Sequence, residues 1–225
     1  MDYKKSWIRT KDGSSTIRIN SLKESYHSLH GAVTESEFVY IDNGLVFWQK
    51  THSASKASVL EIGYGTGLLA FLSFLNQSNN KIGIDYTSLE AYPLKISDLK
   101  RLNYNSFFKS NQHLSFLDFS KLPWNKTNQL TPKYSILKHN IFFEDFKSVR
   151  LYDIIYYDAF GSHAQPNLWE IEWMRKCFEL LNNGGLWISF CAKGSVRRGL
   201  QKVGFDVERL PGPPGKREIL RAIKP

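Results

Sequence analysis

Short apolar runs alternate with longer amphipathic stretches from residue 58 to the end of the chain. The runs expected to form strands are 58–62, 81–89, 134–139, 140–145, 152–158, 186–191, 205–209 and 217–223. Helices are expected over 66–76, 94–102, 168–181 and 195–202. Strands and helices in alternation predict an α/β fold whose mainly parallel sheet carries helices on both faces. Residues 106–130, rich in Asn, Lys and aromatic side chains, match neither periodicity.

The first 50 residues follow a different pattern. Its expected segments are strands over 6–10 and 15–19, a loop over 26–31 and a helix over 32–40. The strands enclose Asp12-Gly13, a dipeptide typical of tight hairpin turns. Asn43-Gly44 is expected to end the helix, the alternative being that residues 45–48 extend it or start a second short helix. The pattern therefore predicts a small β-hairpin and helix arm, residues 1–50, on the substrate side of an α/β domain formed by residues 51–225.

Three glycines at alternate positions follow the first strand of the α/β region, in Glu61-Ile62-Gly63-Tyr64-Gly65-Thr66-Gly67. Glycine lets the backbone turn sharply and approach a ligand, and the helix that follows presents free N–H groups. The spacing differs from the dinucleotide fingerprint G-x-G-x-x-G, and no phosphate-binding loop motif is present. Glu61 would repel a phosphate. The motif therefore favours a cofactor with a cationic end, such as S-adenosylmethionine (SAM), over NAD; a strand–turn–helix without a ligand is the alternative.

Acidic residues end several of the expected strands. Because ligands bind outside the carboxyl ends of parallel strands, these carboxylates should meet at one edge of the sheet. Glu90 is suited to the two hydroxyls of a ribose. Asp145 is suited to an adenine amino group, with the adjacent Glu144 as the alternative. Asp158 is suited to orient an amine toward a methyl group and to help remove its proton, with a loop-capping role as the alternative.

The composition indicates the cellular compartment of the protein and the class of its binding partner. The chain has 225 residues, a net charge of +9 and two cysteines, Cys177 and Cys191, which lack metal-ligand spacing. It has no apolar run long enough to cross a bilayer and no signal-peptide pattern at its start. We therefore expect a cytoplasmic protein with no membrane association, metal or disulfide. Nine Lys or Arg and three acids between residues 193 and 225 suggest a nucleic-acid partner, a solvated basic surface being the alternative.

Three stretches carry a family resemblance. They are Tyr26-His27-Ser28-Leu29-His30-Gly31-Ala32 continuing to Ile41, Tyr157-Asp158-Ala159-Phe160 with Pro166-Asn167-Leu168-Trp169, and Ser195-Val196-Arg197-Arg198-Gly199-Leu200 with Gly215-Lys216-Arg217-Glu218. Together with the glycine motif and Glu90, they resemble the methyltransferase domain of the MnmC family. The resemblance implies a Rossmann-like class I SAM methyltransferase fold with a seven-stranded sheet. It also implies SAM-dependent N-methylation of the 5-aminomethyl group of the wobble uridine in tRNA, giving 5-methylaminomethyl(-2-thio)uridine.

The residue pattern and the resemblance together assign roles to individual side chains. The residues expected to contact SAM are Glu61, Gly63, Tyr64, Gly65, Thr66, Gly67, Glu90, Asp145 and Asp158, of which Asp158 is also the expected catalytic residue. Those expected to contact the tRNA anticodon stem-loop are Tyr26, His27, Glu35, Phe160, Arg197, Arg198, Lys216 and Arg217. Trp169 is a further candidate for stacking on a flipped base, with core packing as the alternative.

The resemblance also bears on the organisation of the protein. Many family members carry a second, FAD-dependent oxidase domain. The chain stops at Pro225, so we expect the stand-alone form, a monomer that binds no FAD and receives an aminomethyl-uridine made by separate enzymes. Two other hypotheses stay open. One is a SAM-dependent methyltransferase or aminopropyltransferase-like enzyme acting on a small amine; the other is an RNA-binding protein with a degenerate cofactor site.

Overall fold

The computed structural model describes residues 4–79, 82–108 and 114–225, and its elements alternate as expected from residue 56 onward. The strands are β1 (Lys5–Arg9), β2 (Ser15–Ile19), β3 (Glu24–Ser25), β4 (Lys56–Ile62), β5 (Gly83–Glu90), β6 (Thr127–Thr131), β7 (Tyr134–Asn140), β8 (Tyr152–Tyr157), β9 (Leu181–Ser189), β10 (Asp206–Pro211) and β11 (Glu218–Ile223). The helices are α1 (Ala32–Ser36), the π-helix η1 (Glu37–Val46), α2 (Phe47–Thr51), α3 (Leu68–Asn79), α4 (Ile96–Leu99), α5 (Tyr104–Phe107), α6 (Phe116–Ser120), the 3-10 helix η2 (Pro166–Trp169), α7 (Ile171–Leu180) and α8 (Gly194–Val203).

The main sheet has 8 strands in the order β10-β11-β9-β8-β4-β5-β7-β6. The five strands from β9 to β7 are parallel, whereas β11, β10 and β6 are joined antiparallel at the two sides. The expected mainly parallel sheet is therefore confirmed. Strand β6 is the addition to the seven strands expected. It lies in the stretch that matched no periodicity, because as an edge strand it has no fully buried residue that would mark it as apolar.

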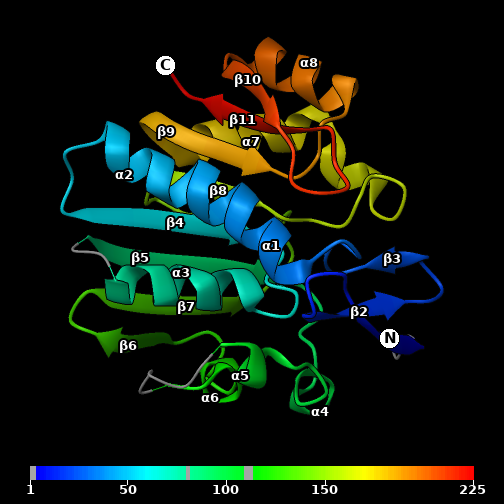
Figure 1. Ribbon diagram of the computed structural model, residues 1–225. Helices are drawn as coiled ribbons and strands as arrows, with labels where there is room; N and C mark the ends of the chain where they lie inside the picture. The colour runs from blue at the N-terminus through cyan, green and yellow to red at the C-terminus, as the bar shows by residue number, and fades with distance from the viewer. Residues whose placement is uncertain (1–3, 80–81, 109–113) are drawn as a thin grey trace.

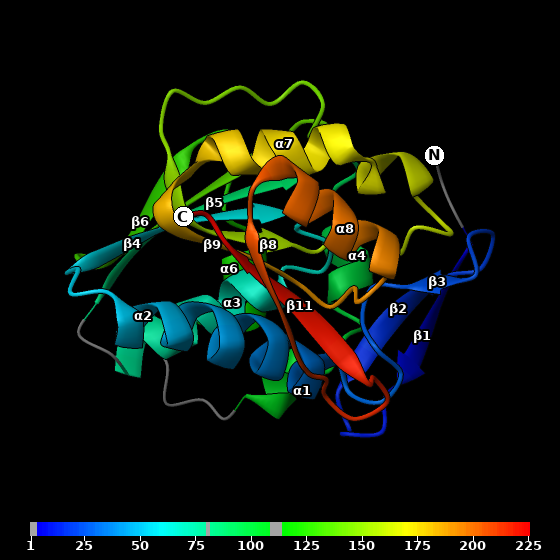
Figure 2. The ribbon, with the colours of Figure 1, turned by 90° about the horizontal axis from the view of Figure 1, so that it is seen from above.

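Helices cover both faces of the sheet, as expected. The continuous helix α1–η1–α2 and helix α3 pack on one face, and α7 packs on the other with α8 beside it (Figures 1 and 2). Buried side chains from α1–η1–α2, β4 and α3 belong to one hydrophobic core, so residues 32–51 pack as part of the layered unit. The division of the chain at residue 50 stays a prediction about its organisation.

The expected end of the first helix at Asn43-Gly44 is wrong, because the helix continues as η1 and α2 to Thr51. Packing against the sheet explains the glycine. A Cβ at Gly44 would lie 3.1 Å from Cε1 of Tyr156, so the missing side chain lets the helix approach β8 closely. The Asn43 side chain donates to the Phe38 carbonyl at 2.7 Å and so bonds within the helix.

Two other expected elements differ from the structure. Of residues 140–145, expected to form a strand, 141–145 instead form a turn after β7, in which the N–H groups of Asp145 and Phe146 both bond to the Phe142 carbonyl. Phe143, inside the expected strand, and Phe146, just after it, are buried because both side chains pack into a second hydrophobic cluster with Leu60, Ile155 and Tyr157. The helix expected over 94–102 is limited to α4. Asn167 lies inside η2 and does not cap α7.

The predicted N-terminal hairpin is confirmed, with a third short strand added to it. Strands β1, β2 and β3 form a separate antiparallel sheet, which lies beside the carboxyl ends of the main-sheet strands (Figures 1 and 2). Lys5 Nζ lies 2.7 Å from Asp98 Oδ2, and the Trp7 indole donates to the Asp98 carbonyl at 3.0 Å. Asn103 donates to the Gly13 carbonyl at 2.8 Å. These contacts hold the arm against the α/β unit.

Candidate active site

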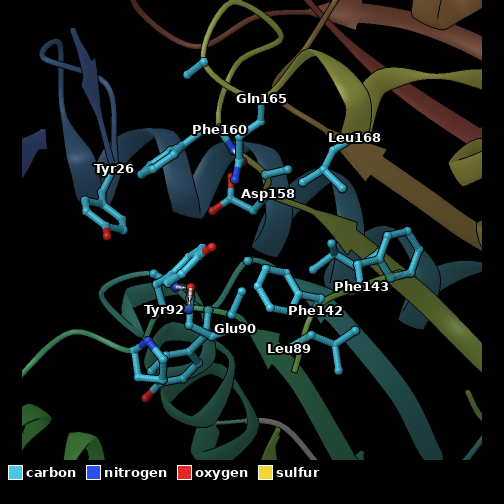
Figure 3. A pocket seen from close by; sticks show the side chains of 18 of the residues that line it. Tyr26, Leu89, Glu90, Tyr92, Phe142, Phe143, Asp158, Phe160, Gln165 and Leu168 are labelled. Atoms are coloured by element: carbon cyan, nitrogen blue, oxygen red, sulfur yellow. Dashed lines mark hydrogen bonds between the residues drawn. The ribbon is translucent and has the colours of Figure 1, made fainter. Parts of the chain in front are cut away.

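A pocket of about 680 Å³ opens at the carboxyl ends of β4, β5 and β8. Strand β4 has β5 on one side and β8 on the other, so the pocket lies at the point where the strand order reverses. Its walls come from the glycine turn after β4, the segments that follow β5, β7 and β8, and the N-terminal arm (Figure 3). The volume is in the range of about 300–1,000 Å³ found for small-molecule sites.

The glycine turn is shaped by close contacts with other parts of the chain. Gly63 and Gly65 have φ values of +96° and +54°, a region that favours glycine. A Cβ on Gly63 would lie 2.6 Å from the Asp158 carbonyl oxygen. A Cβ on Gly65 would lie 2.9 Å from Cδ1 of Tyr26. Glycine at these two positions therefore lets the end of β8 and the arm approach the turn closely, whether or not a ligand is bound.

The other residues of the motif support the turn from behind. Gly63, Tyr64 and Gly65 line the pocket, whereas Thr66 and Gly67 do not. A Cβ on Gly67 would collide with the Tyr64 ring. The Thr66 side chain is fully buried, with its Oγ1 2.8 Å from Nε2 of His27. Thr66 and Gly67 thus lie behind the pocket lining, and their contacts with SAM stay a prediction.

Glu61 lies beneath the turn and outside the pocket lining. Its side chain is 0 % exposed, and Ser88 Oγ donates to its Oε2 at 2.5 Å. Burial raises the pKa of this carboxyl well above its ordinary value, which favours the neutral acid. Glu61 therefore supports the turn from below, and its expected contact with the cationic end of the cofactor stays a prediction.

Glu90 is the last residue of β5 and forms part of one wall of the pocket. The Gly65 N–H donates to its Oε2 at 2.8 Å, and the Tyr92 N–H donates to its Oε1 at 2.9 Å. Burial raises the pKa of Glu90 above its ordinary value, and these backbone hydrogen bonds oppose the rise. Two backbone donors therefore hold the carboxyl group in a fixed orientation at the edge predicted for it.

The segment after β7 contributes an apolar wall and an acid other than the one expected. Ile141, Phe142 and Phe143 line the pocket, and the ring of Phe142 meets that of Tyr92 edge-on at 5.5 Å. Glu144 also lines the pocket, whereas Asp145 is exposed and lies outside its lining. The expected contact of Asp145 with the adenine amino group stays a prediction, and Glu144, the alternative considered, is the acid that lines the pocket.

Asp158 directly follows β8, and its side chain points into the pocket from the side opposite Glu90 and Tyr92 (Figure 3). The Tyr40 hydroxyl donates to Asp158 Oδ1 at 2.6 Å. Burial raises the pKa of Asp158 to about 8, with Glu35 adding to the rise and the Tyr40 hydrogen bond and Lys216 opposing it. Asp158 is therefore a far stronger base than an exposed aspartate and titrates near neutral pH.

Two of the predicted acceptor-side aromatic residues meet at the rim. The rings of Tyr26 and Phe160 are in edge contact at 4.9 Å, and both line the pocket (Figure 3). Trp169 belongs to the core: it is 8 % exposed, its indole donates to the Phe160 carbonyl at 2.8 Å, and its ring packs on Tyr157. Core packing, the alternative considered for Trp169, is correct.

His27 and Glu35 are buried where the arm meets the pocket. Burial lowers the pKa of His27 to about 4, so its ring is neutral at physiological pH and bonds Thr66. Glu35 Oε1 lies 2.5 Å from Lys216 Nζ, and its Oε2 accepts from the Ser28 N–H at 2.9 Å. Only His27 of this group lines the pocket. The Glu35–Lys216 pair joins the arm to the loop between β10 and β11.

The remaining basic candidates lie outside the pocket lining. Arg197 and Arg198 are on α8, the former half-buried and the latter exposed, and Arg217 is exposed in the loop before β11. From above, α8 and the β11 end of this loop are on the same side as the arm (Figure 2). The structure therefore divides the predicted residues into a group in the pocket and a basic group around it.

Sequence reasoning missed Tyr40, Tyr92 and Gln165. Gln165 Oε1 accepts from the Phe160 N–H at 3.0 Å and so shapes the loop after Asp158. Tyr40 lies on an apolar helix face, and nothing in the pattern separates it from a core aromatic residue. Tyr92 carries a usable signal, because it closely follows the strand-end acid Glu90 and precedes Pro93.

Within residues 4–79, 82–108 and 114–225, no group of three or more His, Cys, Asp or Glu side chains is placed to hold a metal ion. In the same ranges, every helix is too short or too polar to cross a membrane.

Comparisons with known proteins agree with this geometry. The sequence model of a family described as S-adenosyl-L-methionine-dependent methyltransferase matches residues 109–225. The chain is 30% identical to the tRNA 5-methylaminomethyl-2-thiouridine biosynthesis bifunctional protein MnmC of Actinobacillus pleuropneumoniae serotype 5b (strain L20), over 95% of this chain and 34% of that protein. It is 27% identical to the protein of the same name from Pseudoalteromonas atlantica, over 96% of this chain and 34% of that protein. The chain thus spans about a third of the length of these relatives.

A solved structure extends the likeness to the whole fold. The crystal structure of MNMC2 from Aquifex aeolicus superposes with a TM-score of 0.77 at 20% identity, covering 100% of this chain and 72% of that one. At this identity the match is evidence about architecture, and it agrees with the predicted Rossmann-like sheet.

Proposed function

This chain belongs to the family of S-adenosyl-L-methionine-dependent methyltransferases, and we propose that its acceptor is the 5-aminomethyl group of the wobble uridine in tRNA. The observation that carries the proposal is the placement of Asp158, a carboxyl with a raised pKa that points into the pocket across from Glu90. The names of the relatives that match 95% or more of the chain support the same acceptor. The product would be 5-methylaminomethyl(-2-thio)uridine, made in the cytoplasm.

The hydrogen-bond acceptors and the apolar wall of the pocket fit SAM. Glu90, fixed by two backbone N–H groups, is suited to accept from ribose hydroxyls, and the wall formed by Ile141, Phe142 and Phe143 is suited to an adenine ring. Glu144 lies beside that wall, and we assign it, in place of Asp145, to the adenine amino group. When bound, SAM supplies a methyl group on a positively charged sulfur.

Asp158 would prepare the acceptor. A primary amine in water is mostly an ammonium ion at neutral pH, and it has no lone pair for attack until it loses a proton. The Asp158 carboxylate would accept that proton and hold the amine by a hydrogen bond, so that the lone pair faces the methyl group. The new N–C bond takes the place of the methyl group's bond to sulfur, whose electron pair stays on the sulfur. Asp158 would later release the proton to solvent.

The surface around the pocket is suited to an RNA acceptor. Lys193, Arg197 and Arg198 at the start of α8 and Arg217 before β11 are basic side chains suited to phosphate contacts. Such contacts position a tRNA without reading its sequence. The wobble base must leave its stack to reach Asp158, and the Tyr26–Phe160 pair at the rim is suited to stack on it.

Binding of SAM should raise the melting temperature of the protein. A ligand that binds only the folded state stabilises it by about 2.7 kcal/mol at 100 times its Kd. Thermal unfolding with SAM, NAD or FAD added at the same concentration measures the effect, and only SAM should act. Glu90→Gln should reduce the shift, because an amide would present N–H donors to the backbone N–H groups of Gly65 and Tyr92. A melting temperature unchanged by saturating SAM would contradict the assignment of the pocket.

Binding of tRNA should weaken steeply as salt increases. Each phosphate contact contributes about one counterion to the slope of log affinity against log salt concentration. Arg197→Ala should lower the affinity and reduce the slope, as measured by filter binding at several salt concentrations. Lys50→Ala is the matched control, because Lys50 is an exposed cation on α2 at the other end of the molecule. Equal effects of both substitutions would mean that the basic charge acts without a defined docking face.

A small-amine acceptor is the competing function, and the strand-end Asp158 is compatible with it. Methyl transfer from labelled SAM to tRNA carrying 5-aminomethyl-uridine, compared with spermidine and other small amines, separates the two. Nucleoside mass spectrometry of tRNA from cells that lack the protein gives the same answer in vivo. Aminomethyl-uridine without its methyl group should accumulate, and an unchanged nucleoside profile would reject tRNA as the acceptor.

A further inference from the structure

The buried hydroxyl of Tyr40 is in direct contact with the reacting side of the pocket, and no role has been given to it so far. We propose that Tyr40 is a positioning residue that holds the Asp158 carboxyl by one oxygen and leaves the other, Oδ2, to face the acceptor amine. The inference rests on the methyl transfer proposed above and adds the residue that orients the Asp158 carboxylate.

The geometry of the contact favours a fixed carboxyl. The Tyr40 hydroxyl lies 2.6 Å from Asp158 Oδ1 and 3.4 Å from the Tyr157 carbonyl, so it spans the end of β8. A hydroxyl bound to a carboxylate at this distance forms a charge-assisted hydrogen bond. No hydrogen bond to Asp158 Oδ2 is found among the described residues, and Asp158 lines the pocket. One oxygen is thus held by the protein and the other is available.

Tyr40 is itself held rigidly. Its side chain is 2 % exposed, and its ring meets that of Tyr156 edge-on at 5.3 Å. The ring belongs to η1, one turn before Gly44, whose missing Cβ lets this helix lie against Tyr156. A π-helix of 10 residues is unusual, and such segments are frequent at functional sites. The close approach of helix to sheet therefore delivers a hydroxyl to the end of β8.

Three ionisable side chains, Glu35, Lys216 and Glu61, act on Asp158 electrostatically. Tyr40 acts on it differently, through a hydrogen bond. Glu35 on α1 and Lys216 before β11 act on Asp158 with opposite signs and form an ion pair with each other. Glu61 on β4 is buried beneath the turn. Burial raises the pKa of Tyr40 well above its ordinary value, so the hydroxyl stays a donor at every working pH. Among these groups, the hydrogen bond from Tyr40 alone fixes a particular oxygen of Asp158.

Tyr40→Phe removes the hydroxyl and keeps the ring. We expect kcat for methyl transfer to tRNA to fall roughly 10- to 100-fold, the size expected for one hydrogen bond to a charged group. The Kd for SAM and the KM for tRNA should change by less than about 3-fold. The acid limb of the pH profile of kcat/KM should move to higher pH, because the lost hydrogen bond had favoured the ionised carboxylate. Tyr156→Phe is the matched control, since Tyr156 is a buried tyrosine beside Tyr40 without a bond to Asp158.

A merely structural role for Tyr40 predicts a different result. In that case Tyr40→Phe and Tyr156→Phe would lower the melting temperature alike and leave the pH profile in place. A kcat within 3-fold of the wild type, or an acid limb that does not move, would overturn the proposal. The control variant should keep the wild-type profile.

A second measurement tests the contact without any acceptor. The melting temperature is followed from pH 5 to pH 9 for the wild type, Tyr40→Phe, Asp158→Asn and the double variant. Tyr40→Phe should extend the pH-dependent loss of stability to higher pH, and the double variant should show the same pH dependence of the melting temperature as Asp158→Asn alone. If Tyr40→Phe changes the pH dependence equally in both backgrounds, the hydroxyl does not act through Asp158. If the wild type fails to methylate tRNA while this coupling is present, the acceptor is wrong and the Tyr40 contact stands.

Discussion

Asp158→Asn should lower kcat/KM for methyl transfer roughly 10²- to 10⁴-fold, the range found when a general base is removed. The amide keeps the size of the side chain and an oxygen for the Tyr40 hydroxyl, but it cannot take the proton of an ammonium ion. The Kd for SAM, measured by calorimetry, should change little, because Glu90 and the aromatic wall are untouched. Turnover within about 5-fold of the wild type would show that Asp158 only shapes the loop after β8.

The pH dependence of the same variant gives an independent check. The pKa of Asp158 is raised to about 8 in the folded protein from an ordinary value of 3.8. Between these values the folded state holds a proton that the unfolded state has lost, so this group's contribution to stability decreases as pH rises from about 4 to about 8. The slope is at most about 1.4 kcal/mol per pH unit. Relative to the wild type, Asp158→Asn should therefore become progressively more stable across this window.

The same titration determines the sign of the rate effect. The free enzyme must carry the ionised carboxylate to accept a proton, so kcat/KM of the wild type should rise with pH up to about 8. Below this pH, the contribution of Asp158 to stability decreases as pH rises while kcat/KM increases, because burial favours the neutral acid whereas the reaction needs the carboxylate. A flat rate profile from pH 6 to pH 9 would assign the proton transfer to another group.

Gly63→Ala should destabilise the fold by roughly 2–5 kcal/mol and abolish SAM binding. The φ of +96° costs a residue with a Cβ about 1–2 kcal/mol. In addition, the new Cβ would lie 2.6 Å from the Asp158 carbonyl oxygen, and overpacking of this kind costs typically 1–3 kcal/mol. Relief of the contact would separate the ends of β4 and β8 and so widen the pocket. Chemical denaturation and SAM calorimetry measure the two effects.

Gly13→Ala separates the backbone cost of a positive φ from the cost of the steric collision. Gly13 also has a positive φ, +86°, but the nearest atom to its added Cβ is a flexible Arg9 nitrogen at 3.8 Å. It should show the backbone cost alone and keep SAM affinity. Equal losses in the two variants would mean that the collision at Gly63 is relieved without consequence.

Features encoded by local pattern were predictable from the sequence. The alternation of apolar strands with helices predicted the mainly parallel sheet. The positions of Glu90 and Asp158 at strand ends predicted the edge of the sheet at which the pocket lies. Asp-Gly gave the hairpin. Each of these depends on residues close together in sequence or on a rule about where parallel strands end.

Features that depend on a partner distant in sequence were not predictable. Gly44 resembles a helix stop until Tyr156 is placed against it. Glu61 resembles a ligand contact until Ser88 is found bonded to it in the core. Tyr40 carries no local mark, because its partner Asp158 is 118 residues away. In each case a tertiary contact overrides the meaning that the residue has in its own segment.

The ion pair between Glu35 and Lys216 joins the N-terminal arm to the loop before β11, so its two residues lie far apart in sequence. Gly215, with a φ of +88°, lies so close to the His30 ring that no side chain fits there. A ribosome must therefore extend the chain through Lys216 before the arm has its partner. Contacts of such long sequence separation close late because the intervening chain loses much conformational freedom. The junction between the arm and the loop before β11 should then be among the last parts of the molecule to form.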